Sequence, residues 1–295
     1  MKNIKMDIFN IVTPKKLVLR SIFLGDKKAK NVFVFVHGLG GNLFSRIEFL
    51  ETLVDKKNTA VLTFSNRGNG TINMLKKVNP RKSSGYDWFK AGMAHEVFSD
   101  CVDDIDGAVL SAQAAGAKNI YLIGHSTGCQ KSIYYSSKRP KSPVKGIILL
   151  APMSDYADAY AYNDRKSYNK ALNKAQQMLK NGQKHELMPA GFWPTVIDAQ
   201  RWFSLYSPQG KEEIFTYASG RRPLVLLKNK KPVLVVLAEA DEYSDRPMSE
   251  IASWFSQALA EQSAQVKIIK KAPHSFVGQF KNLKKVISDW LETGK

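Results

Sequence analysis

Cysteine is scarce in this sequence, which contains only two among its 295 residues. Cys101 and Cys129 belong to no CxxC pair and to no cluster of cysteine and histidine. Such an arrangement predicts neither a disulfide framework nor a zinc site. We therefore expect two buried thiols and no resident metal ion.

Long apolar runs are also missing. No stretch of about 18 consecutive apolar residues occurs, which argues against a membrane-spanning helix. The first residues, MKNIKMDIFNIVTPKK, place the charged Lys5 and Asp7 where a signal peptide needs a continuous apolar segment. The sequence accordingly predicts a cytoplasmic protein without a membrane span.

Acidic residues are too few to balance the basic ones: 26 Asp and Glu against 44 Lys and Arg give a net charge of +18. Such an excess is compatible with nucleic acid, an anionic membrane or an anionic substrate. The lysines, however, outnumber the arginines and are spread along the whole chain. We interpret them as a solvated surface and predict no nucleic-acid partner, with a preference for an anionic ligand as the alternative.

Apolar periodicity alternates between two kinds of element along most of the chain. Runs such as NVFVFVHG and KPVLVVLAEA are continuous and rich in valine, as strands buried on both faces are. The predicted strands are 16–25, 31–38, 59–68, 119–124, 144–152, 231–240 and 264–272, and the predicted helices are 44–57, 95–116, 129–139, 248–262 and 279–293. This order predicts the α/β class, with a mostly parallel sheet covered by helices on both faces.

One long interval, residues 155–230, breaks this alternation. Its first half is polar, rich in tyrosine and lysine, and helical in character, and its second half is rich in proline, glycine and aromatic residues. An insertion of this length between two core strands is too long for a simple connection. We expect it to form a cap over the carboxyl ends of the strands, while residues 1–154 and 231–295 form the core domain.

Two glycines flank a serine in the pentapeptide GHSTG, residues 124–128, where a predicted strand meets a predicted helix. G-x-S-x-G in this context is typical of a nucleophile turn. The turn strains the backbone of the serine, and glycines on both sides relieve collisions between neighbours. We predict that Ser126 is a nucleophile. The alternative is a glycine-rich turn whose serine only caps the helix.

A serine hydroxyl needs a base to take its proton, and five histidines are available. His274, in KKAPHSFVG, follows the last predicted strand and therefore belongs at the same sheet edge as Ser126. His125 would point away from the hydroxyl of its neighbour. The remaining three are His37, His95 and His185. We predict His274 as the base, with a loop histidine of no catalytic task as the alternative.

A third residue should orient the imidazole and stabilise its protonated form. Asp241, in AEADEYSD, comes directly after the predicted strand 231–240, again at the carboxyl edge of the sheet. We predict it as the acid, and a solvated loop carboxylate is the alternative. Its competitors are Glu239, Glu242, Asp245 and, after the preceding core strand, Asp155.

Acyl transfer also requires N–H donors for the negatively charged oxygen of the intermediate, and losing one typically costs about 3–4 kcal/mol. The N–H of Thr127, directly after the serine, is one predicted donor. The other is predicted in the loop HGLGGN, at Leu39 or, as the next choice, at Gly40. A dinucleotide-binding loop is disfavoured because Leu43 stands where that motif needs a third glycine.

The motifs FVHGLGG, SNRGNG, LIGHSTG, ILLAP, LAEADEY and APHSF, in this order, resemble those of the α/β-hydrolase superfamily over nearly the whole chain. SNRGNG departs from the frequent form by placing Asn66 where Asp is common. More narrowly, GHSTGCQ, LLAPMSD and RWFSLYSPQG resemble a group of hydrolases that includes fungal siderophore esterases. The order Ser126, Asp241, His274 is the order of the superfamily's catalytic triad.

This resemblance implies a serine hydrolase that cleaves a small-molecule ester through an acyl-enzyme intermediate and requires no cofactor. The narrower resemblance implies a hydroxamate-type or similar small ester. An amidase, a thioesterase, a lipase or a carbon–carbon hydrolase would use the same triad. Two other classes stay open: a non-catalytic ligand-binding protein on this scaffold, and a nucleic-acid or membrane-surface protein that uses the positive charge.

Aromatic residues in the predicted cap could line a substrate pocket, but we favour the interpretation that they form the cap's own small core. Lysines at 166, 170 and 174 favour an anionic ester or else lie on a solvated helix face. The sequence makes no prediction of the oligomeric state. The aromatic residues concerned are Tyr156, Tyr160, Tyr162, Trp193, Trp202, Phe203 and Tyr206.

Overall fold

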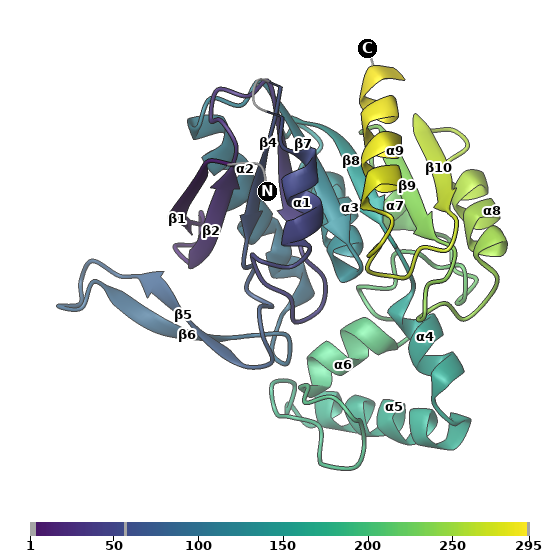
Figure 1. The fold of residues 1–295 in the computed structure, drawn as a ribbon. Coiled ribbons are helices and arrows are strands. Elements are labelled where there is room, and N and C mark those ends of the chain that lie inside the picture. Colours follow the sequence, from purple (N-terminus) through teal and green to yellow (C-terminus); the bar gives the residue numbers. More distant parts are fainter. Residues whose placement is uncertain (1–3, 56–57, 294–295) are drawn as a thin grey trace.

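An eight-stranded sheet forms the centre of the computed structural model, which describes residues 4–55 and 58–293 (Figure 1). The order across the sheet is β1-β2-β4-β3-β7-β8-β9-β10, antiparallel from β1 to β4 and parallel from β4 to β10. The strands are β1 (Met6–Val12), β2 (Val18–Leu24), β3 (Asn31–Val36), β4 (Thr59–Phe64), β7 (Asn119–His125), β8 (Val144–Leu150), β9 (Val233–Ala238) and β10 (Ala264–Ile269). The predicted α/β class with a mostly parallel sheet is confirmed.

The central strands are buried along nearly their whole length because helices cover both faces. All six residues of β9 are buried, as are the last five of β3. Successive side chains of a strand point to opposite faces, so each strand contributes to two apolar clusters. Val34 joins one cluster and its neighbour Phe35 joins the other. This explains why the strands appear in the sequence as unbroken apolar runs.

Two sets of helices cover the two faces (Figure 1). On one face, α1 (Ile47–Leu53) and α9 (Phe280–Thr293) bury side chains such as Phe49 and Leu283 against the sheet. On the other face lies the apolar cluster that includes Val34 of β3, and its helical members include Ile105, Ile133 and Phe255. The helices of that face are α2 (Cys101–Ala114), which follows the 3-10 turn η1 (Phe98–Asp100), α3 (Thr127–Lys138), α7 (Leu224–Leu227) and α8 (Met248–Ala258).

The structure differs from the predicted elements at several places. The first strand, β1, was not predicted, because its alternate residues are exposed at the edge of the sheet. The helix expected over 44–57 is shorter and begins at Ile47, and residues 56–57 lie outside the described residues. The helix expected over 95–116 begins with η1, so that His95 precedes it.

A β-hairpin that was not predicted follows β4. It consists of β5 (Asn73–Val78) and β6 (Tyr86–Ala91), which form a two-stranded antiparallel sheet apart from the central one. In Figure 1 the hairpin projects away from the body of the molecule. Only one of its twelve strand residues, Ala91, is buried, which explains why no apolar alternation revealed it in the sequence.

Three helices of the region predicted as a cap lie as a separate group beneath the carboxyl ends of the strands (Figure 1). They are α4 (Asp155–Tyr162), α5 (Arg165–Lys180) and α6 (Ala199–Tyr206). They enclose an apolar cluster of their own around Trp202, Tyr168 and Met178. The later residues Phe215 and Leu226 instead join the cluster against the sheet. The end of the 155–230 interval, which follows α6, therefore packs with the body of the molecule.

Buried charges join these three helices to the body. Arg201 of α6 pairs with Glu96, at 3.0 Å, and with Glu212, while Glu96 also pairs with Lys131 of α3 at 2.6 Å. Burial raises the pKa of Glu96, but the two cations lower it more, to a net value of about 2. Since all four side chains are buried, removing one partner would leave a charge uncompensated, which typically costs about 3–5 kcal/mol.

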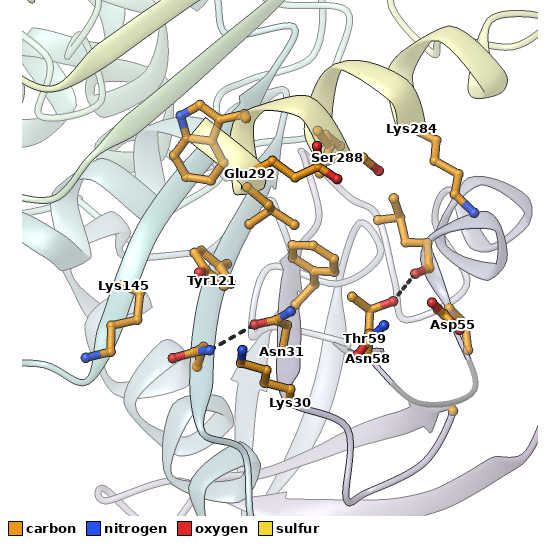
Figure 2. A pocket seen from close by; sticks show the side chains of 18 of the residues that line it. Lys30, Asn31, Asp55, Asn58, Thr59, Tyr121, Lys145, Lys284, Ser288 and Glu292 are labelled. Carbon is orange, nitrogen blue, oxygen red and sulfur yellow. Dashed lines mark hydrogen bonds between the residues drawn. The ribbon is translucent and has the colours of Figure 1, made fainter. Parts of the chain in front are cut away.

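A groove of about 1620 Å³ opens at the opposite end of the sheet (Figure 2). The ends of α1 and α9 form its walls, and Tyr121 and Asn31 lie on its floor, at the beginning of β7 and β3. Asn119 donates a hydrogen bond to Asn31 across these strands at 3.0 Å. The GHSTG turn lies at the other end of β7, so this groove is far from it.

Candidate active site

The backbone at Ser126 has the strained geometry that the glycine pattern predicts. Its φ of 55° and ψ of −129° lie outside the regions that L-residues prefer, while Ser126 stands between β7 and α3. A Cβ on Gly124 would lie 2.4 Å from the carbonyl oxygen of Gly128, and one on Gly128 would lie 2.0 Å from that of Val36. Both glycines are therefore required by close backbone approach, and the serine stays partly exposed among buried neighbours.

His274 and Asp241, the predicted base and acid, lie side by side. The imidazole Nδ1 is 2.8 Å from the Oδ2 of Asp241, and both side chains are largely buried. His274 lies on the loop after β10, and Asp241 on the loop after β9, because parallel neighbouring strands bring the loops at their carboxyl ends together. The hydrogen bond holds the ring in one orientation and turns its other nitrogen away from Asp241.

The competitors of Asp241 have other partners. Glu242 accepts a hydrogen bond from the backbone N–H of His274 at 2.9 Å, and Glu239 accepts one from Lys271. Asp245 forms an ion pair with Arg246. Asp155, the more distant alternative, accepts a hydrogen bond from the side chain of Gln130 at 2.7 Å. Among the predicted acids, the structure thus places only Asp241 on the imidazole of His274.

His125 supports the loop of His274, a role that the sequence did not indicate. Its Nε2 lies 2.9 Å from the carbonyl oxygen of His274, and the two rings are 5.0 Å apart. Burial, together with the neighbouring imidazole of His274, lowers the pKa of His125 to about 3. The neutral ring therefore donates from Nε2 to this carbonyl. Tyr243 packs edge-on against the other side of the His274 ring, at 4.9 Å.

The loop HGLGGN, residues 37–42, lies directly beside the nucleophile turn. A Cβ on Gly38 would lie 2.9 Å from the Cβ of Ser126 and 3.4 Å from its Oγ. The loop is held by His37, whose Nδ1 donates to Gly38 O while its Nε2 accepts from the N–H of Asn66. Burial is the main cause that lowers the pKa of His37 to about 4, so the ring stays neutral and keeps both bonds.

The two predicted oxyanion donors, Thr127 and Leu39, belong to segments that lie beside Ser126. Thr127 is the first residue of α3, where an N–H has no acceptor within its own helix. Leu39 lies in the loop next to Ser126, and its side chain packs against the apolar cluster of the α4–α6 group. The carbonyl of Gly40 accepts a hydrogen bond from Gly70 at 3.1 Å, which fixes the far end of the loop.

The predicted nucleophile and base are not hydrogen-bonded to each other. Within residues 4–55 and 58–293, no hydrogen bond joins the Oγ of Ser126 to His274. The two remaining histidines lie elsewhere. The Nδ1 atoms of His95 and His185 face the buried Asp198, at 3.1 and 3.4 Å, where the chain enters α6. The part of the chain that the structure describes holds no group of His, Cys, Asp or Glu suited to a metal ion.

The α4–α6 group brings an acidic side chain to the His274–Asp241 pair. Tyr162 of α4 donates its hydroxyl to the carbonyl of Ser244, at 2.8 Å, in the loop that carries Asp241. Asp158 lies one turn earlier on the same side of the helix. Burial and the nearby charge of Asp241 raise its pKa to about 6, against the opposing effect of His274. The surroundings of His274 are thus acidic in a strongly basic protein.

Both cysteines are free and buried, as predicted. Cys129 lies one turn into α3, and its thiol donates to the carbonyls of Gly124 and Leu150, at 3.2 and 3.3 Å. Burial raises the pKa of both thiols well above its ordinary value. Both therefore stay protonated, and Cys129 serves to brace the nucleophile turn from below.

Solved structures that resemble this fold include esterases and a thioesterase domain. The superposition on the Pyrococcus furiosus esterase Pf2001 covers 98% of this chain and 91% of the esterase, with a TM-score of 0.57 and 16% sequence identity. The superposition on Est1E of Butyrivibrio proteoclasticus, solved with ferulic acid, covers 97% of this chain and 98% of Est1E, with a TM-score of 0.62 and 14% sequence identity. The thioesterase domain of the curacin biosynthetic pathway has a TM-score of 0.56. These likenesses establish the α/β-hydrolase fold.

A curated relative is found in Mycoplasma genitalium. It is named "Putative esterase/lipase 2" and is 27% identical over 238 residues, which cover 78% of this chain and 79% of the relative. Within the described residues, no helix has the length and apolar character needed to cross a membrane. A family model described as "Protein of unknown function (DUF1749)" matches residues 14–292, nearly the full length. The chain belongs to this DUF1749 family, whose fold is that of the α/β-hydrolases.

Proposed function

We propose that the protein is a serine hydrolase that cleaves a small-molecule ester, with Ser126, His274 and Asp241 as its triad. The observation that carries the proposal is the convergence of a strained Ser126 and a His274–Asp241 pair at one edge of the sheet. The name of the mycoplasmal relative and the esterases among the structural neighbours support ester bonds as the target.

The reaction would proceed in two steps. Ser126 attacks the ester carbonyl while the free nitrogen of His274 accepts its proton, and Asp241 stabilises the imidazolium that results. His274 then returns the proton to the departing alcohol, which leaves an acyl-enzyme. Water activated by the same histidine releases the acid and restores the serine. In this scheme His274 must approach the Oγ of Ser126 when substrate binds, as catalytic hydrogen bonds often tighten only in the complex.

The negative oxygen of each intermediate would lie between the N–H groups of Thr127 and Leu39. Thr127 adds the partial positive charge at the beginning of α3. His37 and the neighbouring Asn66 act as positioning residues, because they hold the loop of Leu39 through backbone atoms. The reaction so described uses residues of the chain, the substrate and one water molecule.

The α4–α6 group, together with the rest of 155–230, would serve as the cap that selects the substrate. Several of its aromatic residues are committed to its own core, since Trp202, Tyr168 and Tyr206 are buried there. Tyr156 and Trp193 are only partly buried and pack on this core, as does Leu39 of the oxyanion loop. These three side chains are therefore the proposed apolar contacts of the acyl or alcohol group.

Two features of the cap favour opposite charges on the substrate. The lysines of α5 at 166, 170 and 174 favour an anionic ester, but they line a separate shallow pocket with Phe192. Asp158 is near His274 and carries a negative charge above about pH 6. Matched anionic, neutral and cationic esters would separate these effects. A preference for the anionic ester would support the lysines, and its rejection would support Asp158.

Labelling and hydrolysis together test the triad. The intact protein should bind a fluorophosphonate covalently, and Ser126→Ala should abolish labelling and reduce ester hydrolysis by at least about a thousandfold. A panel of esters, amides and thioesters of one acyl group would identify the preferred bond. Ser132→Ala, a buried helix serine that donates to Gly128, is a matched control that should keep labelling.

Failure to label at any pH between 6 and 9 would contradict the enzyme and favour a ligand-binding protein on the same scaffold. Asp241→Asn and Glu242→Gln separate the two neighbouring acids. The first should lower kcat by several orders of magnitude, because it disturbs the orientation of the imidazole. The second should lower it less than tenfold, because Glu242 contacts only the backbone of His274.

A further inference from the structure

The hairpin β5–β6 exposes one face that combines apolar and basic side chains. The register pairs Lys76 with Trp88 and Met74 with Lys90, and paired residues point to the same face. Trp88 is 59% exposed and Met74 is 49% exposed, and the two lysines are exposed as well. Val78 and Tyr86 continue this face toward the tip, with Val78 37% exposed. We name these six residues the hairpin face.

The opposite side of the hairpin is fixed to the body of the protein. Leu75 and Phe89, which are paired in the register, pack against the apolar cluster of the sheet. The backbone N–H of Val78 donates to the carbonyl of Lys16 at 2.8 Å, and Lys77 bridges to Leu17. The hairpin face is therefore held outward.

Positive charge dominates this element. Lys76 and Lys90 lie on the hairpin face, and Arg81 and Lys82 lie at the tip between the strands. Asp87 is the one acidic residue between positions 72 and 92, and it is engaged by Lys82 and by Asn79. Lys76 covers the ring of Tyr86 at 4.3 Å, which keeps its ammonium over the face. An anionic surface would find both charge and apolar contacts here.

The hairpin begins and ends beside the candidate active site. At its base, Met93 donates from its N–H to Gly70, whose own N–H donates to Gly40 of the loop 37–42. The Sδ of Met93 would lie 2.9 Å from a Cβ on Gly40, so side chain and loop are in direct contact. The base of the hairpin therefore contacts the loop that flanks Ser126.

We propose that the hairpin face docks on an anionic lipid surface, with Trp88, Met74 and Val78 in the interfacial layer and Lys76 and Lys90 on the headgroups. Tryptophan prefers the interface between headgroups and acyl chains, and lysines next to it gain from anionic lipid. Nucleic acid fits less well, because aliphatic side chains such as Met74 and Val78 have no role in backbone contacts or base stacking. The arrangement would bring esters dissolved in such a surface to Ser126.

Vesicle binding by the Ser126→Ala protein tests the proposal without any hydrolysis. At low salt the protein should sediment with phosphatidylcholine vesicles containing 30% phosphatidylglycerol, and not with pure phosphatidylcholine. The double variant Lys76→Glu/Lys90→Glu should bind at least about tenfold more weakly. The control Lys118→Glu/Lys145→Glu changes two exposed lysines at the opposite end of the sheet and should keep most of the binding.

Tryptophan fluorescence locates the contact. Mixed vesicles should shift the emission to shorter wavelength in the parent protein, and Trp88→Phe should remove most of this shift. Absence of vesicle binding, an equal loss in the control pair, or an unchanged shift in Trp88→Phe would overturn the proposal. Tight binding to an oligonucleotide in place of vesicles would also overturn it. Loss of fluorophosphonate labelling bears only on the hydrolase, so the two failures are distinguishable.

Discussion

The cap helices and the hairpin flank the same candidate site but are attached to the body in different ways. The α4–α6 group has its own apolar cluster and reaches the body through the buried charges of Arg201, Glu96 and Lys131. The hairpin has no cluster of its own; Leu75 and Phe89 pack on the cluster of the sheet, and backbone bonds hold the hairpin at Val78 and at its base. Buried charge pairs demand one geometry, whereas a hairpin bound along one side leaves its other face available. The attachment of the cap therefore suits a binding site of fixed shape, whereas the attachment of the hairpin suits contact with another surface.

Two tryptophans test this difference most strongly. Trp202 is fully buried in the cap cluster, while Trp88 is 59% exposed on the hairpin face. Trp202→Ala should lower the free energy of unfolding by about 3–5 kcal/mol, because it leaves a cavity. Trp88→Ala should change it by less than about 0.5 kcal/mol. Denaturant unfolding followed by circular dichroism measures both, and equal losses would show that the hairpin is packed as tightly as the cap.

Two glycines test whether the base of the hairpin positions the oxyanion loop. A Cβ on Gly92 would lie 2.6 Å from the carbonyl oxygen of Thr71, and its φ of +99° disfavours other residues. Gly92→Ala should cost about 2 kcal/mol of stability and lower kcat more than it raises KM. Gly85→Ala, at the open tip, meets no atom within 4 Å and should cost only about 1 kcal/mol, from its φ of +74°. Unchanged ester hydrolysis in a folded Gly92→Ala protein would show that the base of the hairpin does not position the oxyanion loop.

The beginning of the cap should also respond to pH. The hydroxyl of Ser154, which caps α4, donates to Glu213 at 2.6 Å, and burial raises the pKa of Glu213 to about 7. An unfolded glutamate titrates near 4.5, so ionisation disfavours the folded state increasingly from pH 4.5 to 7. Glu213→Gln should therefore gain about 1–3 kcal/mol relative to the parent between pH 5 and pH 8. A constant difference across this range would contradict the effect.

Most of the sheet could be predicted because its strands are buried on both faces. Continuous apolar runs such as 31–36 and 233–238 have few alternative structures, and the glycines around Ser126 leave the turn little freedom. The edge strand β1 and the hairpin lack this signal. Their residues are half exposed, and their partners, such as Lys16 for Val78, are distant in the sequence. Their position depends on packing that no local pattern encodes.

The candidate site was predictable residue by residue only where a strand fixes the loop that follows. Asp241 and His274 come directly after β9 and β10, and the parallel pairing of these strands brings them together. Asp241 and Glu242 are adjacent, and the conformation of the turn after β9 decides which of them faces the imidazole of His274. The support from His125 depends on a contact across 149 residues of sequence, so it could not be inferred from the chain.

The two buried cysteines simplify spectroscopic work on the hairpin. Maleimides react with thiolates, and both native thiols are inaccessible and have a raised pKa. Ser83→Cys, at the exposed tip of the hairpin, would therefore provide a single reactive position in an otherwise unaltered protein. A dye attached there would report how closely the tip approaches any surface, with both native cysteines left in place.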